Sequence, residues 1–276
     1  MNYSEPKIST ITAVSNINTI INLNNLFENC FIDKKFVYVE YGNNKNLSNF
    51  KGNKPQKKKP TKKRFDNQLT IIYSYDNNNV NIKLFKNGKI QMTGLKSIEQ
   101  GKETTINLIN YIKIHQNIYK NIIEDNNENY NENYNENQIK TIENDYGMYL
   151  SNYKICLINA DFKINFKIKR KDLFNYLLNN TDLIVSFEPC IYPGVKIQFF
   201  YNNNENGICN CNPFCSRKNK MNCSKITIAI FESGCIIITG SKHLKHTYLC
   251  FNFIKNIIIS NKKLFEKFEL VPRHSF

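Results

Sequence analysis

Four cysteines are spaced closely enough to share one metal ion, in the pattern Cys209-x-Cys211-x3-Cys215-x7-Cys223. Thiolates bind Zn²⁺ tetrahedrally, and four of them leave no coordination position open for water, so the pattern predicts one structural zinc ion. The polar segment that carries them cannot form a core of its own, and a metal would give it order. The alternative is a set of free thiols in an Asn-rich loop.

Other residue types that could do chemistry are sparse. The nine cysteines are odd in number and the chain starts without the pattern of a secretory signal, so we expect an intracellular reducing compartment. None of the four histidines stands at a catalytic spacing from an acid or a cysteine, and we expect no enzymatic activity. His243 and His246 could suit a metal, but a solvated helix face is the commoner position for such a pair. The other two histidines are His115 and His274.

The charge of the chain favours a polyanionic partner. The 276 residues carry a formal net charge of +15, which suits nucleic acid or an anionic membrane surface, and nucleic acid is the better match. No apolar run reaches the ~18 residues that a membrane span needs. The heavy use of Asn, Lys and Ile gives the charge an alternative origin, because an AT-rich genome encodes lysine often.

Two segments 146 residues apart repeat one pattern. Residues 82–97 read IKLFKNGKIQMTGLKS, and residues 228–243 read IAIFESGCIIITGSKH. In each copy an alternating strand, a glycine-containing turn and a second strand ending at Thr-Gly predict a β-hairpin. The identical pairs are Ile82/Ile228, Phe85/Phe231, Gly88/Gly234, Ile90/Ile236, Thr93/Thr239, Gly94/Gly240 and Lys96/Lys242.

The elements around the hairpins also correspond. A long amphipathic helix is expected after each hairpin, at roughly 97–121 and 243–267. A strand and a short helix are expected upstream, at 8–14 and 23–30 in the first copy and at 154–162 and 170–179 in the second. Two such copies sharing one antiparallel sheet predict an α+β fold with helices on one face. The other sheet face is then open to a ligand.

The predicted organisation has two repeats and three irregular segments. The irregular segments are polar, and the one between the copies repeats Asn-Glu-Asn-Tyr, as a disordered linker does. The basic run 54–64 is either a patch of the nuclear-localisation type, a phosphate-contacting loop or a solvated insertion. The predicted boundaries are 8–121 for repeat 1 with a basic insertion at 43–64, 122–150 for the linker, and 151–270 for repeat 2 with a Cys-rich insertion at 202–224.

The hairpin pattern resembles a known family. Phe-x-x-Gly-x-Ile-x-x-Thr-Gly-x-Lys, present twice, is similar to the stirrup hairpin of the TATA-box-binding proteins. The segment FEPCIYPG at 187–194 resembles the family's YEPELFPG, and Arg64-Phe65 resembles the Arg-Phe that opens the matching strand of the first copy. The insertions and the cysteine cluster resemble those of versions carried by large DNA viruses. The resemblance implies a saddle-shaped, curved sheet with its helices on the convex face.

The resemblance implies that the open face binds the DNA minor groove, where inserted aromatic side chains unstack base steps. The implied wedges are Phe65 and Phe85 in the first copy and Tyr192 and Phe231 in the second. For any one of these aromatics, the alternative is a place in the core. The other residues implied to contact DNA are Arg64, Lys89, Gln91, Thr93, Lys96, Ile237, Thr239 and Lys242, of which Lys96 and Lys242 would contact phosphate.

The first strand of each copy departs from the family. The family has an Asn at the saddle centre followed two residues later by Val. The alignment places Thr10 and Thr12 there in copy one, and Leu157 and Asn159 in copy two. Thr12 and Asn159 are the candidates for DNA contact, and Asp161 would lie near the DNA face, where a carboxylate is unfavourable. Either the register is shifted or strict TATA specificity is lost.

The sequence therefore predicts a transcription initiation factor that binds and bends AT-rich promoter DNA as a monomer. By resemblance, it would recruit a TFIIB-like factor and RNA polymerase, in a nucleus or in a cytoplasmic viral factory. The first alternative is a protein-interaction scaffold on the same fold without DNA binding. The second is a single-stranded nucleic-acid binder, which would stack bases on its aromatics and show no preference for duplex.

Overall fold

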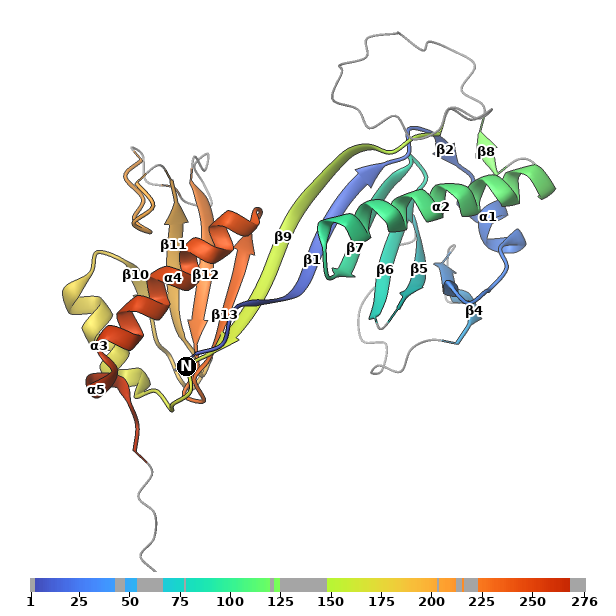
Figure 1. Ribbon diagram of the computed structural model, residues 1–276. Coiled ribbons are helices and arrows are strands. Elements are labelled where there is room, and N and C mark those ends of the chain that lie inside the picture. The colour runs from blue at the N-terminus through green and yellow to red at the C-terminus, as the bar shows by residue number, and fades with distance from the viewer. Residues whose placement is uncertain are drawn as a thin grey trace, which may run out of the picture. The chain divides into compact units, whose positions relative to one another are not determined.

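The computed structural model describes residues 3–42, 48–53, 67–76, 78–119, 122–124, 148–202, 204–211, 215 and 223–268 (Figure 1). The chain divides into two compact units. We call residues 11–156 the repeat 1 unit, and residues 1–10 with 157–276 the repeat 2 unit. Most of the linker predicted at 122–150, and all of the basic run 54–64, lie outside the described residues.

The repeat 1 unit holds an antiparallel sheet with strand order β1-β7-β6-β5-β3-β4. A separate two-stranded pair, β2–β8, joins the start of the unit to the segment after α2. The elements are β1 (Lys7–Asn16), β2 (Ile20–Ile21), α1 (Leu23–Asn29), β3 (Phe36–Gly42), β4 (Ser48–Gly52), β5 (Gln68–Tyr75), β6 (Asn78–Phe85), β7 (Lys89–Leu95), α2 (Ile98–Tyr119) and β8 (Ile123–Glu124).

The repeat 2 unit has the same topology with one strand fewer. Its order is β9-β13-β12-β11-β10, again antiparallel. The elements are β9 (Ser151–Lys163), α3 (Arg170–Asn180), β10 (Ile184–Ser186), β11 (Val195–Tyr201), β12 (Ser224–Ile230), β13 (Cys235–Ser241), α4 (Leu244–Ser260) and α5 (Lys262–Phe265). The first strand thus pairs with the last strand of the hairpin in both units, and the predicted order of elements is confirmed.

Two elements differ from the prediction. The helix expected at 243–267 is interrupted at Asn261, whose side chain donates to the Ile257 carbonyl at 2.9 Å and so ends α4. The insertion expected at 43–64 contributes a sixth strand, β4, to the repeat 1 sheet. Lys51 of β4 donates to the Glu28 and Cys30 carbonyls, at 2.7 and 3.0 Å, and thereby satisfies acceptors at the end of α1.

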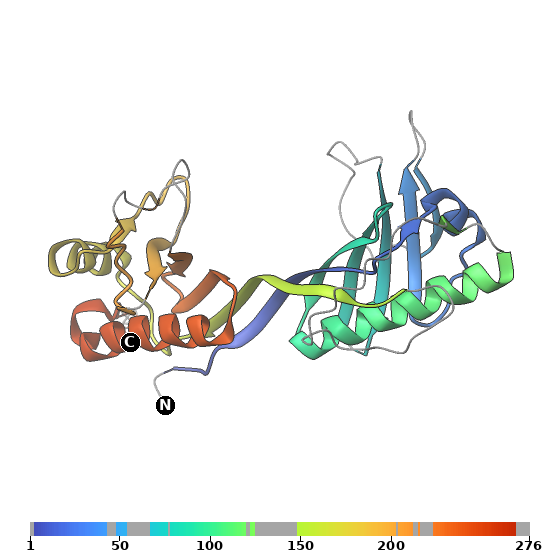
Figure 2. The same cartoon turned by 90° about the horizontal axis from the view of Figure 1, so that it is seen from above.

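Each sheet has one buried face and one open face. Along β7 the buried residues are Ile90, Met92 and Leu95, and along β13 they are Ile236, Ile238 and Ser241, with the other residues half-buried or exposed. Helix α2 crosses the repeat 1 strands and α4 crosses the repeat 2 strands (Figures 1 and 2). In repeat 2 the buried strand residues form one core with residues of α3, α4 and α5. The predicted α+β class with helices on one face is confirmed.

A β-bulge explains the repeated Thr-Gly. Gly94 and Gly240 have φ of 93° and 98°, and the pairing of each hairpin strand with the first strand shifts register there. A Cβ at Gly94 would lie 2.7 Å from the Asn79 carbonyl oxygen, so no other residue fits without backbone movement. The strands therefore continue past the glycine, to Leu95 and Ser241, instead of ending at it as expected. None of the described helices is long and apolar enough to cross a membrane.

Candidate nucleic-acid interface and metal centre

The two predicted threonines occupy equivalent positions on the two open faces. Thr12 pairs with Thr93 in repeat 1, and Asn159 pairs with Thr239 in repeat 2, in each case beside the bulge. Thr239 Oγ1 donates to Asn159 Oδ1 at 2.5 Å. That bond occupies the carbonyl oxygen of Asn159 and leaves its two N–H groups as donors toward the open face.

The remaining predicted residues of β7 and β13 share these faces. Lys89, Gln91 and Thr93 alternate along β7, with Gln91 opposite Val14 of β1. Ile237 on β13 is 37% exposed and lies opposite Asp161 of β9. Asp161 is exposed on the same face, as the sequence suggested.

The two lysines predicted to contact phosphate also correspond. Lys96 and Lys242 are exposed, and each directly follows the last residue of its hairpin strand, just before the long helix begins. The backbone N–H of Lys96 donates to Gln100 Oε1 at 2.6 Å, which fixes the path of the chain into α2.

Tyr192 and Phe231 form an aromatic pair at the hairpin end of the repeat 2 sheet. Their ring centroids are 5.7 Å apart, and the Lys196 ammonium lies 3.8 Å from the centroid of the Tyr192 ring. Gly194 makes room for both rings, because a Cβ there would lie 2.9 Å from Tyr192 and 3.2 Å from Phe231. Both side chains are half-buried, so neither is a core aromatic.

Phe85 is the repeat 1 counterpart of Phe231 and is also half-buried. It lines an open cavity of about 1100 Å³ within this unit, together with Val14, Lys89 and Gln91 of the open face. Asn16 and Asn87 also line this cavity. Arg64 and Phe65, the other residues predicted at this end of repeat 1, lie outside the described residues.

Arg170, at the start of α3, joins the two segments that carry the aromatic pair. Its guanidinium donates to the Pro193 carbonyl, next to Tyr192, and to Glu232 Oε2 at 2.9 Å, next to Phe231. Lys267 donates to the other Glu232 oxygen at 2.6 Å, and together Lys267 and Arg170 hold the pKa of Glu232 below its ordinary value. No sequence pattern predicts this bridge, because its partners are far apart along the chain and no motif joins them.

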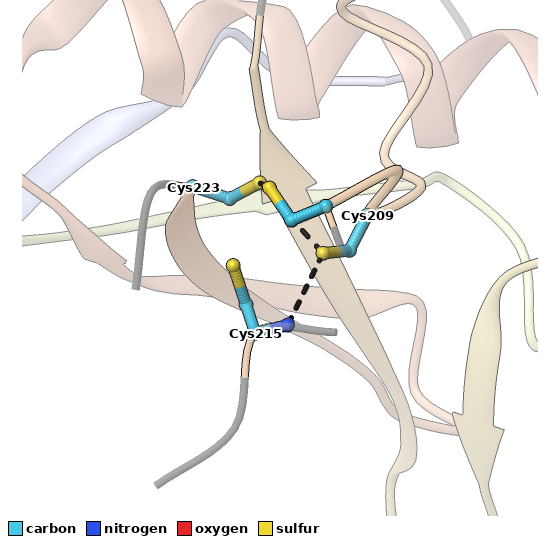
Figure 3. A group of neighbouring side chains, drawn as sticks. Cys209, Cys215 and Cys223 are labelled. Carbon is cyan, nitrogen blue, oxygen red and sulfur yellow. Dashed lines mark hydrogen bonds between the residues drawn. The ribbon is translucent and has the colours of Figure 1, made fainter. Parts of the chain in front are cut away.

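The four cysteines of the insertion converge, and Figure 3 labels Cys209, Cys215 and Cys223 of this group. All four Sγ atoms lie within 4.8 Å of one another, with 3.5 Å between Cys211 and Cys223 and 3.9 Å between Cys223 and Cys209. Zn–S bonds of about 2.3 Å place the corners of a tetrahedron about 3.8 Å apart, so these separations fit the ion. Burial raises the pKa of Cys223 to about 12, and a bound cation would oppose that effect by stabilising the thiolate.

The cluster packs on the end of the repeat 2 sheet. Phe200 of β11 is 2% exposed and lies against the cysteines, while its neighbour Phe199 belongs to the core on the helix side. Asn202 donates to the Ile208 carbonyl at 2.7 Å and to Cys223 Sγ at 3.8 Å. One side chain therefore contacts both the first part of the insertion and a candidate metal ligand near its end.

His246 corrects an expectation. It is buried on α4, with its ring stacked 3.7 Å from that of Tyr201, instead of lying on a solvated helix face. Burial, with the nearby His243 and Lys245, lowers its pKa. The pair His243/His246 does not belong to the cysteine cluster.

One solved structure and one curated protein are similar to this chain. The structure of Methanococcus jannaschii TBP is similar, with 19% identity and a TM-score of 0.49 over 93% of this chain and 99% of that one. No protein-family model matches the chain. A TATA-box-binding protein-like protein of Acanthamoeba polyphaga mimivirus is 30% identical over 96% of this chain and 67% of its own length. Identity at that level over nearly the whole chain places it in the TATA-box-binding protein-like family.

Proposed function

We propose that this protein is a DNA-binding transcription initiation factor that binds AT-rich promoter DNA through the minor groove and bends it. The proposal rests on the duplicated open face. Both units present a hairpin threonine paired with a polar residue of the first strand beside the bulge, an aromatic residue at the hairpin turn and a lysine after the second strand, at equivalent positions. A scaffold without DNA binding would have no need for the same three features in both repeats.

The chemistry of the open face suits a minor groove. A·T pairs offer only acceptors there, which match the hydroxyl of Thr93 and the N–H donors of Asn159, whose carbonyl oxygen accepts from Thr239. Phe85 and Phe231 would enter base steps from the two hairpin ends and unstack them. Kinking by inserted apolar side chains is the mechanism already established for this family, and the proposal carries it over.

The partners follow from the same assignment. The helices α2 and α4 leave the open face free for DNA, so their outer surfaces would recruit a TFIIB-like factor and RNA polymerase. The protein would act as a monomer on DNA and would catalyse no reaction itself.

The cysteine cluster would hold one structural zinc ion. Cys209, Cys211, Cys215 and Cys223 would supply four thiolates, and the ion would order an insertion that has no apolar core of its own. With no open coordination position, the ion would do no chemistry on a substrate.

The experiment is a titration into an AT-rich duplex labelled at both ends, with binding and end-to-end distance read together. The wild-type protein should bind and shorten the distance. The variant F85A/F231A should bind, because its phosphate contacts remain, but should leave the duplex nearly straight. The matched control Y119A/Y248A removes two exposed aromatics from α2 and α4 and should bend like the wild type.

Three other outcomes decide against the proposal. Absence of duplex binding at low salt, where phosphate contacts are strongest, would favour the interaction scaffold. Equal affinity for duplex and single strand, without shortening, would favour single-stranded nucleic acid as the ligand. A double variant that bends DNA fully would remove Phe85 and Phe231 as the wedges.

A further inference from the structure

The two open faces differ at one matched position near their centres. Two residues after Thr12, β1 carries Val14, which lies opposite Gln91. Two residues after Asn159, β9 carries Asp161, which lies opposite Ile237. Each repeat thus pairs one aliphatic with one polar side chain at this position, but the polar group is an amide in repeat 1 and a carboxylate in repeat 2.

Asp161 meets no donor among the described residues. The side chain is exposed, its cross-strand neighbour is an isoleucine, and no hydrogen bond or ion pair of its carboxylate occurs within the described parts of the chain. Lys163, on the same face, lies further toward the strand end, opposite Cys235. When a ligand covers a carboxylate, the carboxylate loses its hydrogen bonds to water, and this costs binding free energy unless the ligand supplies a hydrogen-bond donor. A ligand on this face must therefore supply the donor or lose affinity.

The minor groove offers such a donor at one kind of base pair. A·T and T·A present only the adenine N3 and thymine O2 acceptors, which repel a carboxylate, whereas G·C adds the guanine N2 amine as a donor. A carboxylate only accepts hydrogen bonds, while the amide of Gln91 can donate to an A·T pair or accept from guanine. The two repeats are therefore matched to different base pairs.

We propose that Asp161 is a specificity-determining residue that accepts a hydrogen bond from the guanine N2 amine, so that the half-site under repeat 2 contains a G·C pair. The inference rests on the proposed minor-groove function and refines it. The half-site under repeat 1 stays A·T-tolerant. Because only one half-site carries guanine, Asp161 also sets the direction in which the protein lies on the promoter.

The test is a set of AT-rich duplexes in which one G·C pair is moved step by step along the site. When the G·C pair lies at one particular position, away from the centre of the DNA site, the wild-type protein should bind that duplex about tenfold more tightly than the all-A·T duplex. Replacing that guanine by inosine removes the N2 amine and leaves the major groove unchanged. The gain in affinity should then disappear.

Two variants make the assignment specific. D161N keeps the size of the side chain but can donate to A·T acceptors, so it should bind the guanine, inosine and all-A·T duplexes within about twofold. D161V copies Val14 of repeat 1 and should bind the all-A·T duplex more tightly than the wild type does. The inference about Asp161 is overturned if the wild-type protein binds the guanine and inosine duplexes equally, or if D161N keeps the preference for guanine. Either result leaves the proposed minor-groove function standing. Absence of binding to every duplex overturns the proposed function with it.

Discussion

Arg170 shows how one side chain can set the geometry of a site that it does not enter. Its guanidinium contacts the Pro193 carbonyl and the Glu232 carboxylate, and so joins the residues next to Tyr192 and Phe231. The Arg170 guanidinium also lies 5.5 Å from the centre of the Phe187 ring. A planar fork can hold two acceptors in fixed directions, which a lysine ammonium on a flexible stem does less well. Arg170 is thus a positioning residue for the aromatic pair.

Replacing Arg170 by glutamine should therefore reduce bending more than binding. At saturating protein, R170Q should shorten the end-to-end distance of the labelled duplex less than the wild type does, and R170K should recover part of the difference. The loss of folding stability should be small, roughly 1 kcal/mol, because the ion pair is partly solvated.

The control is K245Q, which removes the same charge from the ion pair with Glu205 in the same unit. K245Q should leave the bend unchanged. Full bending by R170Q at saturation would show that the aromatic pair holds its place without this contact.

At the residue scale, the internal repeat predicts residues that occupy matching positions in the two copies. It does not predict contacts between residues that are far apart along the chain. Thr93 and Thr239 could be found because a constant spacing of 146 residues aligns them. The sequence left the register of their cross-strand partners Thr12 and Asn159 open, since the first strands share little sequence. The observed pairing places both opposite those threonines. The buried stacking of His246 on Tyr201 follows from tertiary packing, which helical spacing alone does not encode.

The Cys-rich insertion is an element that brings four cysteine side chains together. The sulfur separations match a thiolate tetrahedron, and the cysteines pack against Phe200 while Ile208 packs against the repeat 2 core. Cys209 and Cys223 lie near the end of β11 and the start of β12, so the ion would close the insertion at the strand ends.

Purified protein should contain one zinc ion per chain by elemental analysis. A strong chelator should remove the ion, lower the melting temperature by a few degrees and open the insertion to proteolysis, because the thiols lose their shared partner. C223S should behave like the chelated protein. C190S, which changes an exposed cysteine outside the cluster, should keep its zinc. Metal-free protein with the same melting temperature and protease resistance would contradict the assignment.

Elements were more predictable than their boundaries. Alternation and helical spacing were enough for both hairpins and all four main helices, since each has a continuous buried face. The end of α4 at Asn261 was missed, because a side-chain cap, and no break in the apolar pattern, stops it. Strand β4 was missed because its stabilising contacts, from Lys51 to the end of α1, are tertiary.

At the scale of the whole molecule, the net charge of +15 predicts a strong salt dependence of binding. Each phosphate contact contributes close to one to the slope of log affinity against log salt concentration. K96Q and K242Q should each lower the slope by about 1 and weaken binding to all sequences alike. K255Q, on helix α4, should not change it. Slopes that are identical in all four proteins would remove Lys96 and Lys242 from the interface.

The composition of the repeat 2 unit has a consequence for how the protein is made. Its residues 3–10 come from the start of the chain: Ser4 N–H donates to the Lys163 carbonyl at 2.8 Å, and the Tyr3 ring lies 6.1 Å from that of Phe251. On the ribosome Tyr3 and Ser4 are synthesised well before Phe251 and Lys163, their partners in this unit. These contacts therefore cannot form until residue 251 has been synthesised, and a fragment starting at residue 151 would lack residues 3–10 of its own unit.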